Sequence, residues 1–555
     1  MPLPRSAFRR VLRRGLVLAA SAMLASCASA PPGHAQSPPP SPGGEQPTSA
    51  PPALVVVFTV DQMRADYLDR FGTQFTGGLA RLVKEGTRFT NAVHDHAITE
   101  TAPGHAAILS GRFPRSTGIT ANIFGVEDAS MPLVLGDGPG ASPRRFRGTT
   151  LADWMAARDR RTRVLSVSMK DRGAILPVAR EHWSVFWYSP DGAFTTSRYY
   201  GDTVPTWVTQ ANIAPDAWRT AGRAWTLALP EAMYSEPDSV AEESSGTDFA
   251  FPHAIPADTL MAAGYVRTTP MIDSITLAFA WRGVRAMQLG ARAGGTDLLA
   301  VSLSATDYIG HRFGPDSREI HDQLIRLDRS LGWFLDSLTA LRGADRVLVA
   351  LTADHGVQRI PALAARTWKG PGLAPTRVTL EDTWQGFLAW MARAKGDTNI
   401  VAFENGVLLA NRERLAKGKV SAAVLADTFV ARMRTAPHVL RAETFTAMAA
   451  ADTVQDEIAR RWLHMFDPGG VALAAVTLEP GNIWSERLVA THGTPHHDDA
   501  HVPLLFWGAG IAPATRTERV RVVDLAPTLA DWLGVRPTER VDGRVLPLAR
   551  SAPSH

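Results

Sequence analysis

Short apolar runs alternate with helical patterns from residue 54 onward. Five runs are apolar throughout: ALVVVFTV (53–60), RVLSVS (163–168), LLAVSLS (298–304), VLVALTA (347–353) and PLLFWG (503–508). Such runs are typical of parallel strands that are buried on both faces of a sheet. Helices are predicted over 77–86, 321–341 and 524–534, and the second has apolar residues at helical spacing. The alternation predicts an α/β fold with a doubly wound, mostly parallel sheet.

Two long stretches depart from this alternation. Residues 180–290 are rich in Trp, Tyr and Pro, and residues 358–485 mix loops with helical patterns. We interpret both as insertions into one main domain over residues 54–548, where they form a lid or a substrate wall. Their aromatic side chains are expected to build local cores rather than a surface that stacks on nucleic-acid bases.

The N-terminal residues have the pattern of an export signal. Residues 1–26 combine an arginine-rich start with the apolar run GLVLAASAML, which is too short to span a bilayer as a mature helix. The segment Leu24–Cys27 resembles a bacterial lipobox, so we expect a periplasmic lipoprotein anchored at Cys27. The alternative is ordinary cleavage after Ala30 or Ala35. Residues 27–53 are rich in Pro, Ser and Ala, and they are expected to form a tether.

Composition and charge indicate an ordinary globular protein. The chain has 555 residues, of which 45% are hydrophobic and 20% are charged. Its formal net charge of +4 arises in the export signal, whose five arginines leave −1 for the rest. A basic surface for a nucleic-acid partner is therefore not predicted. Cys27 is the only cysteine, so no intramolecular disulfide is possible, and we expect a monomer.

Candidate metal ligands follow several of the predicted strands. Asp61 comes directly after the first run, and Asp354 and His355 follow the fourth. Asp307 and His311 are four residues apart, so on a helical turn they share a face and can hold one ion. Ligands bind beyond the carboxyl ends of strands in open α/β sheets. Each residue alone has a simpler interpretation, such as the cap of the next helix for Asp61.

A histidine-rich loop, THGTPHHDDAH, supplies further candidates. It contains His492, His496, His497 and His501 together with two aspartates. Such a loop can also be merely solvated, and the spacing does not decide which histidine binds a metal.

Thr101 lies in the segment TETAPGHA, just before a predicted helix. Pro103 can occupy the first turn of a helix, so Thr101 is expected at or just before the N-terminus. Its hydroxyl could simply cap that helix. In the positive field of the N-terminus, however, it is also well placed beside a bound anion. A metal on the hydroxyl would lower its pKa and make it a nucleophile.

These motifs together resemble those of the alkaline phosphatase superfamily. The segments are TVDQMR, TETAPGHAAILSG, Asn122, MKDRGAILP, TDYIGHRFGP, TADHG and THGTPHHDDAHVPLLFWG. Within the superfamily they are most similar to the PafA-type phosphate-irrepressible alkaline phosphatases, which are relatives of the nucleotide pyrophosphatase/phosphodiesterases. The resemblance extends over residues 54–548 and implies an alkaline-phosphatase-like catalytic domain.

The resemblance implies two zinc ions. One would be held by Asp307, His311 and His492, and the other by Asp61, Thr101, Asp354 and His355. It thus selects His492 from its loop. It also implies that Asn122, Lys170 and Arg172 contact the nonbridging oxygens of a phosphate. A dianionic phosphate monoester suits two cationic side chains, although the segment KDR could also be an ordinary solvated loop.

The implied activity is hydrolysis of phosphate monoesters through a phosphothreonine at Thr101. Two alternatives remain at this point: a phosphodiesterase or nucleotide pyrophosphatase of the same superfamily, and a noncatalytic lipoprotein that binds phosphate or metal. A sulfatase is disfavoured, because its cysteine-derived nucleophile cannot form: the only cysteine, Cys27, belongs to the predicted lipobox of the export signal.

Overall fold

The computed structural model describes residues 51–551 except 395, 419 and 486. The predicted export signal, Cys27 and most of the predicted tether lie outside the described residues. Within the described part of the chain, no helix combines the length and the apolar character needed to cross a membrane.

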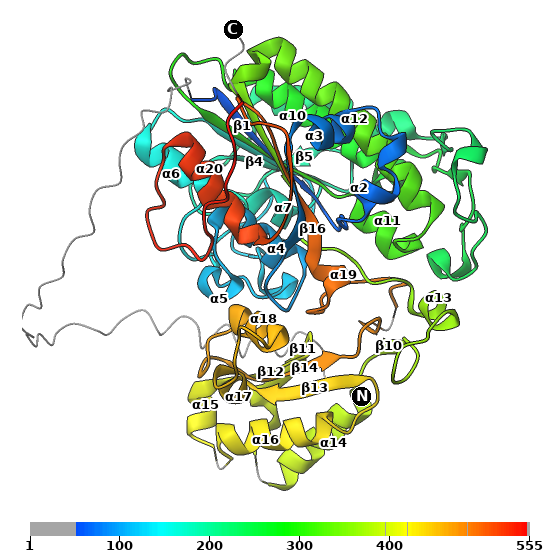
Figure 1. The fold of residues 1–555 in the computed structure, drawn as a ribbon, viewed down its shortest axis with the longest axis vertical. Coiled ribbons are helices and arrows are strands. Elements are labelled where there is room, and N and C mark those ends of the chain that lie inside the picture. The colour runs from blue at the N-terminus through cyan, green and yellow to red at the C-terminus, as the bar shows by residue number, and fades with distance from the viewer. Residues whose placement is uncertain (1–50, 395, 419, 486, 552–555) are drawn as a thin grey trace, which may run out of the picture.

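A nine-stranded sheet forms the centre of the larger part of the molecule (Figure 1). Its strands are, in spatial order, β17 (Ala514–Arg521), β2 (Thr87–Val93), β16 (His501–Gly508), β9 (Val347–Thr352), β1 (Leu54–Val60), β8 (Asp297–Leu303), β3 (Val164–Ser168), β4 (Ser184–Tyr188) and β5 (Phe194–Thr195). Strands β1, β3, β4, β8 and β9 run parallel to one another. The predicted α/β fold with a mostly parallel sheet is confirmed.

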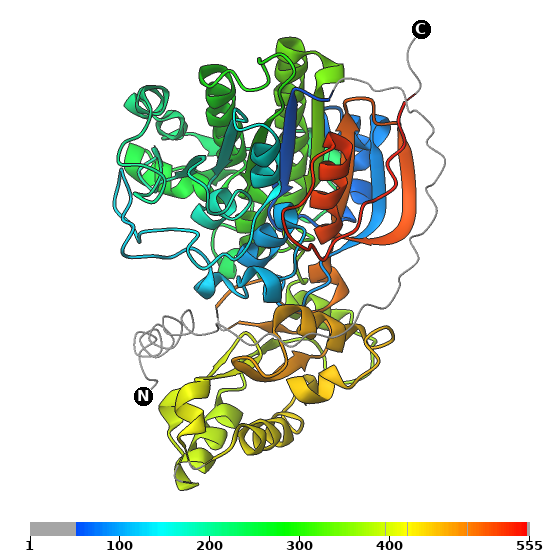
Figure 2. The same cartoon turned by 90° about the vertical axis from the view of Figure 1, so that its left-hand side faces the viewer.

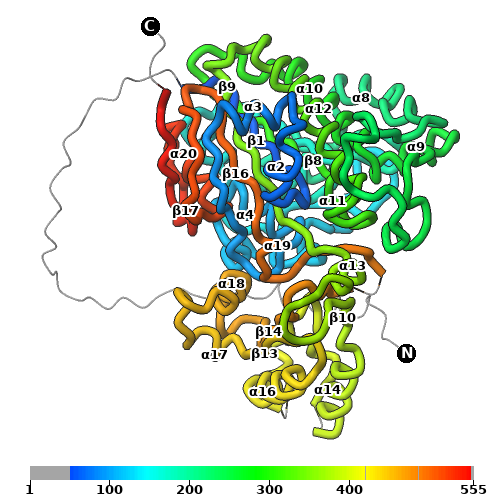
Figure 3. Tube along the Cα trace, turned by 45° about the vertical axis from the view of Figure 1, so that its right-hand side comes forward, coloured from blue at the N-terminus to red at the C-terminus, as the bar shows by residue number. Residues whose placement is uncertain are grey.

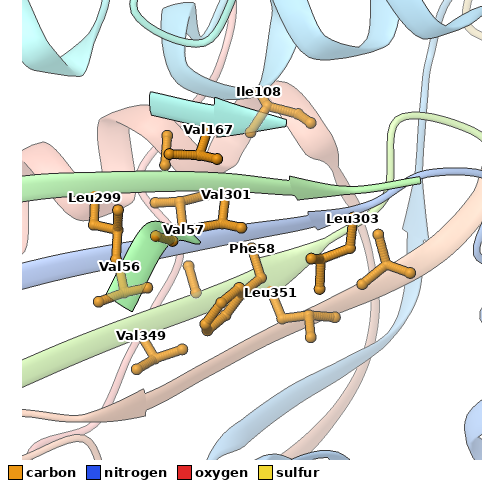
Figure 4. Packing of buried hydrophobic residues seen from close by; sticks show 14 of the residues in the cluster. Val56, Val57, Phe58, Ile108, Val167, Leu299, Val301, Leu303, Val349 and Leu351 are labelled. Atoms are coloured by element: carbon orange, nitrogen blue, oxygen red, sulfur yellow. The ribbon is translucent and has the colours of Figure 1, made fainter. Parts of the chain in front are cut away.

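The central strands are buried along their whole length, as their apolar runs predict. Every residue of β1, β8 and β9 is buried. Figure 4 shows the side chains of Val56, Phe58, Val301 and Leu351 packed in this core. Burial of apolar surface stabilises the fold by about 25 cal/mol per Å². The packed strands thus provide a rigid base for the loops at their ends.

One strand differs in direction from what its apolar run suggests. Strand β16, predicted from PLLFWG as part of the buried parallel set, is antiparallel to both β9 and β2. It is buried like its neighbours because helices cover both faces of the sheet, and burial does not fix direction. The segment that precedes β16 therefore lies at the same edge as the carboxyl ends of β1, β8 and β9.

Helices cover both faces of the sheet (Figure 1). One layer contains α3 (Gly78–Glu85), α10 (Met271–Ala286) and α12 (Arg318–Arg342), and the other contains α4 (Thr101–Ser110), α6 (Leu151–Arg158), α7 (Asp171–Ile175) and α20 (Leu525–Leu533). The helices predicted over 77–86, 321–341 and 524–534 correspond to α3, α12 and α20. Shorter elements of this part are α2 (Tyr67–Arg70), α5 (Pro114–Thr117), α8 (Thr206–Ile213), α9 (Thr259–Tyr265), α11 (Ala305–Phe313) and α19 (His497–Ala500).

Residues 358–485 contain a second sheet with its own core, which we call the cap. Its strands are β11 (Val401–Glu404), β12 (Val407–Ala410), β14 (Ala472–Leu478) and β13 (Val439–Thr444), all antiparallel to their neighbours. Its helices are α13 (Pro361–Arg366), α14 (Glu381–Arg393), α15 (Arg412–Ala416), α16 (Ala422–Met433), α17 (Phe445–Ala449) and α18 (Glu457–Met465). Figure 2 shows the cap in yellow below the larger part.

The cap contacts the larger part through α18 and an apolar cluster. Ile98 lies in one cluster with Phe445 and Trp462. His464 donates a hydrogen bond from Nδ1 to the backbone oxygen of Asp95. Figure 3 shows α18 directly below the larger part, with α19 beside the junction. This junction lies at the edge of the nine-stranded sheet where its parallel strands end.

Residues 180–290 are less separate from the nine-stranded sheet than the cap is. Strand β4 belongs to the nine-stranded sheet, and α10 packs against β3 and β8. The remainder carries short pairs such as β6 (Ala224–Trp225) with β7 (His253–Ala254), and Trp225 is fully buried against Phe251. Its aromatic residues thus contribute to the main core.

Candidate active site

The candidate residues gather where the parallel strands end. Asp61 follows β1, Asp307 lies in the first turn of α11 after β8, and Asp354 and His355 follow β9. These four residues are almost completely buried, with exposed fractions of 3% or less. The antiparallel direction of β16 brings the loop with His492 to the same place. The site therefore forms where the carboxyl ends of β1, β8 and β9 meet the segment that precedes the antiparallel strand β16.

Lys170 lies between two of the buried carboxylates. Its Nζ atom is 2.5 Å from Asp61 Oδ2 and 2.5 Å from Asp307 Oδ2. The same atom donates to Thr101 Oγ1 at 3.5 Å. Burial alone would lower the pKa of Lys170, but Asp307 and Asp61 outweigh it and hold that pKa above its ordinary value. Lys170 is thus a charged ammonium group beside the Thr101 hydroxyl.

Three histidines present the same ring nitrogen to the site. The Nδ1 atoms of His311, His355 and His492 donate to the backbone oxygens of Ala490, Gly356 and Thr99, at 2.8, 2.9 and 2.7 Å. A carbonyl oxygen can only accept, so each neutral ring carries its proton on Nδ1. Each Nε2 then offers a lone pair, which is the arrangement found in metal-binding histidines.

These atoms form two groups close enough to hold metal ions. One consists of Asp307, His311 and His492, and the other of Asp61, Asp307 and His355; within each group the ligand atoms lie within 4.8 Å of one another. The first matches the set expected from the resemblance. The second includes Asp307 in place of Asp354, whose Oδ2 atom lies 3.6 Å from His355 Nε2. Asp307 thus stands between the two groups.

Burial and neighbouring charges shift the pKa values of the carboxylates in the site. Burial raises the pKa of Asp61, and the neighbouring charges of Asp307 and Asp354 raise it further. For Asp307 burial acts in the same direction, but Lys170 and His311 outweigh it and hold its pKa well below the usual range. Within the described residues, Asp61 Oδ1 is buried and accepts no hydrogen bond, and Asp354 Oδ2 faces the ring nitrogen Nδ1 of His105 at 3.0 Å. Such oxygens suit metal binding.

The other three histidines of the histidine-rich loop do not point into the site. His496 Nε2 donates to Leu478 O at 2.8 Å, and His501 Nε2 donates to Thr90 O at 2.8 Å. The side chain of His497 is 71% exposed. Geometry therefore separates His492 from its neighbours, which spacing could not do.

Thr101 is the first residue of α4, as expected from Pro103. Its Oγ1 atom lies 3.5 Å from His355 Nε2, and the residue is 2% exposed. Gly104 allows this approach, because a Cβ atom there would lie 2.2 Å from the backbone oxygen of Asp354. The close contact sets the N-terminus of α4 directly against the end of β9.

Comparisons with known sequences and structures show the family to which this chain belongs. The sequence model described as type I phosphodiesterase / nucleotide pyrophosphatase matches residues 55–425, about two thirds of the chain. The chain belongs to this family. The resemblance predicted from its motifs is thereby confirmed.

Several alkaline phosphatases are similar to this chain over most of their length. The chain is 31% identical to alkaline phosphatase PhoV of Synechococcus elongatus, covering 90% of this chain and 93% of that protein. It is 32% identical to alkaline phosphatase PhoK of a Sphingomonas species, covering 90% and 92%. The crystal structure of wild-type alkaline phosphatase PafA matches with a TM-score of 0.81 at 28% identity, covering 90% of this chain and 99% of that one.

Asn122 and Arg172, the two remaining predicted phosphate-binding residues, have the following contacts. The Oδ1 atom of Asn122 accepts a hydrogen bond from the backbone N–H of Ala102 at 2.9 Å, so its amide group is fixed beside Thr101. Arg172 lies in the first turn of α7, and its Nε is buried without a hydrogen-bond partner among the described residues. An unpartnered guanidinium N–H is suited to an anion.

Two residues near the ligands were missed at the sequence level. His105 Nδ1 lies 3.0 Å from both Thr101 O and Asp354 Oδ2, and its Nε2 is 2.8 Å from Ser302 Oγ. Gln62 Nε2 donates to Asp307 Oδ1 at 2.8 Å. The i, i+4 spacing of Thr101 and His105 on one helix face was the available signal for His105.

A third missed feature links the site to the cap. Glu100, just before Thr101, accepts hydrogen bonds from the Asn122 backbone N–H at 2.6 Å and from Asn405 Nδ2 at 2.9 Å. Burial raises the pKa of Glu100. Asn405 comes from the turn between β11 and β12, so no local pattern could have associated it with Thr101.

Proposed function

We propose that this protein is a metal-dependent alkaline phosphatase that hydrolyses phosphate monoesters through a phosphothreonine at Thr101. The observation that carries the proposal is the position of Lys170 Nζ, 3.5 Å from Thr101 Oγ1, with the Asn122 side chain fixed to the backbone N–H of the next residue, Ala102. Three similar curated proteins are named alkaline phosphatases. A solved variant of PafA has a threonine, an asparagine, a lysine and an arginine replaced, the four residue types proposed here.

The ligand atoms fit two divalent cations, and we propose zinc for both. Asp307, His311 and His492 would hold one, and Asp61, Thr101, Asp354 and His355 would hold the other. Neutral histidine Nε2 atoms and buried carboxylates are suitable donors for zinc. When bound, such ions supply Lewis acidity that lowers the pKa of a hydroxyl and stabilises a departing alkoxide.

Thr101 acts as the nucleophile. Its Oγ1 forms a bond to phosphorus as the bond from phosphorus to the ester oxygen breaks, and the hydroxyl proton is lost to solvent. The departing alkoxide takes a proton from water and leaves as the alcohol. In the second step water attacks the phosphothreonine, which releases inorganic phosphate and restores the hydroxyl. The positive field at the N-terminus of α4 favours the anion throughout.

Asn122, Lys170 and Arg172 bind the nonbridging phosphate oxygens. A monoester phosphate carries between one and two negative charges at neutral pH, which two cationic side chains complement. A diester carries a single charge, and its second organic group takes the place of one of the oxygens. Preorganised donors of this kind stabilise charge that develops in the transition state. The residue set therefore favours monoesters over the phosphodiesters in the family's description.

The test compares wild type with Thr101→Ala and Thr101→Ser in hydrolysis of an aryl phosphate, alongside metal analysis of each purified protein. We expect Thr101→Ala to lose at least ~10³-fold in kcat with its metal content retained, and Thr101→Ser to keep substantial activity. Unchanged hydrolysis by Thr101→Ala would refute the nucleophile. Absence of hydrolysis by a wild type that holds metal would instead favour a binding protein.

We further propose that the protein is exported and acts in the periplasm as a monomer, without a nucleic-acid partner. Residues 1–26 would be removed, Cys27 would carry the lipid, and the Pro/Ser-rich segment to residue 53 would separate the enzyme from the membrane. Mass spectrometry of the mature N-terminus distinguishes lipidation at Cys27 from cleavage after Ala30 or Ala35.

A further inference from the structure

A cavity of about 240 Å³ opens between the cap and the larger part of the molecule. Its lining includes Asn122, His311 and His492 of the larger part, Asn405 and Trp484 of the cap, and Leu488, which follows the cap in the chain. The volume corresponds to roughly eight water molecules at ~30 Å³ each. It is therefore larger than the phosphate group alone requires.

The cavity lies on one side of the reacting atoms. Among the described residues, its lining includes His311 and His492 but not Thr101, Asp61 or His355. In a displacement at phosphorus the leaving oxygen departs on the side opposite to the nucleophile. With Thr101 as nucleophile, the organic part of the ester thus extends past His311 and His492, which is the direction of the cavity.

The cap wall of this cavity is a fixed aromatic surface. Trp484 packs edge-to-face against Phe403 at a ring distance of 5.9 Å and lies beside Gly406 of the β11–β12 turn. Leu488, which follows the cap in the chain and is 44% exposed, supplies a second apolar patch. Flat aromatic groups interact favourably with an indole and gain from removal of apolar surface from water.

A partly buried hydrogen bond connects this wall to the residue that precedes the nucleophile helix. Asn405 donates to Glu100 Oε1 at 2.9 Å, and Glu100 Oε2 accepts from the Asn122 backbone N–H at 2.6 Å. The turn is tight, with φ of 49° at Asn405 and 76° at Gly406. The cap wall therefore has a defined position relative to Thr101, and the cavity is preformed.

We infer that this cavity binds the alcohol side of the monoester and selects aryl or similar flat-ring leaving groups over small aliphatic ones. The inference rests on the proposed monoesterase function. Trp484 and Leu488 are specificity-determining residues in this proposal, whereas Asn405 and Glu100 are positioning residues that hold the wall in place.

The experiment measures kcat/KM for phenyl phosphate and methyl phosphate in wild type, Trp484→Ala and Leu488→Ala. Trp333→Ala is the matched control, because Trp333 is 45% exposed on α12 and does not line the cavity. We expect Trp484→Ala to lower kcat/KM for phenyl phosphate about tenfold. Its kcat/KM for methyl phosphate should stay within about twofold of wild type. Leu488→Ala should show the same selectivity with a smaller loss, and Trp333→Ala should change neither.

A binding measurement separates this inference from the proposed function. Calorimetry compares benzylphosphonate, in which a CH₂ replaces the ester oxygen of phenyl phosphate, with ethylphosphonate. We expect Trp484→Ala to weaken benzylphosphonate binding about tenfold and to spare ethylphosphonate. Equal losses for both ligands, or no loss for either, would overturn the inference. If wild type hydrolyses no monoester, the proposed function fails, whereas the two phosphonates still report on the cavity.

Discussion

Lys170 Nζ lies 2.5 Å from Asp307 Oδ2, and both side chains are almost completely buried. A proposed phosphate-binding cation thus touches a proposed metal ligand. Removal of one partner from a buried pair leaves an uncompensated charge, which is strongly destabilising. Loss of Lys170 will therefore disturb the metal ligands as well as the phosphate, and only a comparison between substrates can isolate its role.

His105 is predicted to position Asp354. We expect His105→Gln to weaken metal affinity about 10- to 100-fold, because groups that orient metal ligands have effects of this size. Activity lost by the variant should return on addition of excess metal. Titration of the metal-depleted protein measures the affinity, and His497→Gln, at an exposed ring in the histidine-rich loop, is the control. An unchanged affinity in His105→Gln would show that Asp354 is held without it.

Gly104 is predicted to be essential for the site. Gly104→Ala places a Cβ atom 2.2 Å from Asp354 O, so the N-terminus of α4 must move away from β9. A displacement of about 1 Å at a reacting group can cost ~10²-fold in rate, and we expect at least that loss in kcat.

The matched control is Gly264→Ala in α9, where a Cβ atom meets nothing within 4 Å. This replacement should leave activity unchanged and should not lower the melting temperature, because alanine is favoured over glycine inside a helix. Retention of full activity by Gly104→Ala would contradict the close contact between Gly104 and the backbone of Asp354 after β9.

Glu243 is predicted to make stability depend on pH. Burial raises the pKa of this carboxyl to about 9, and the charge of Glu319 adds to the effect. The unfolded chain ionises near its ordinary value of 4.5, whereas the folded chain keeps the proton. Stability contributed by the protonated group is therefore full below pH 4.5 and is lost as the pH rises toward 9.

Glu243→Gln removes this dependence. We measure the melting temperature of the variant minus that of wild type. We expect this difference to be larger at pH 9 than at pH 6 by about 2 °C or more. Glu413→Gln, at an exposed site on α15, should show no such difference. A constant offset between Glu243→Gln and wild type from pH 6 to pH 9 would be the contrary result.

The sequence predicted the parts of this site that depend on strand ends and helix starts. Asp61 and Asp354 follow apolar runs that form buried strands, and Thr101 precedes a helix marked by Pro103. Strand direction was not predictable for PLLFWG, because an apolar run reports burial on two faces and not orientation. The selection of His492 came from the resemblance rather than from spacing.

The rest of the site depends on contacts between distant segments. Asn405 and Glu100 are 305 residues apart, and the turn that carries Asn405 belongs to the cap. Strand β2 was not predicted, because its sequence TRFTNAV mixes polar and apolar residues. It lies between β16 and the edge strand β17, where such a mixture is tolerated.

The most direct test of the account is the ratio of kcat/KM for phenyl phosphate to that for diphenyl phosphate, in wild type and in Lys170→Ala. The account predicts that wild type prefers the monoester. It also predicts that Lys170→Ala loses at least about tenfold more activity toward the monoester than toward the diester. A wild type that prefers the diester, or equal losses for both substrates in Lys170→Ala, would contradict the assignment of a phosphomonoesterase.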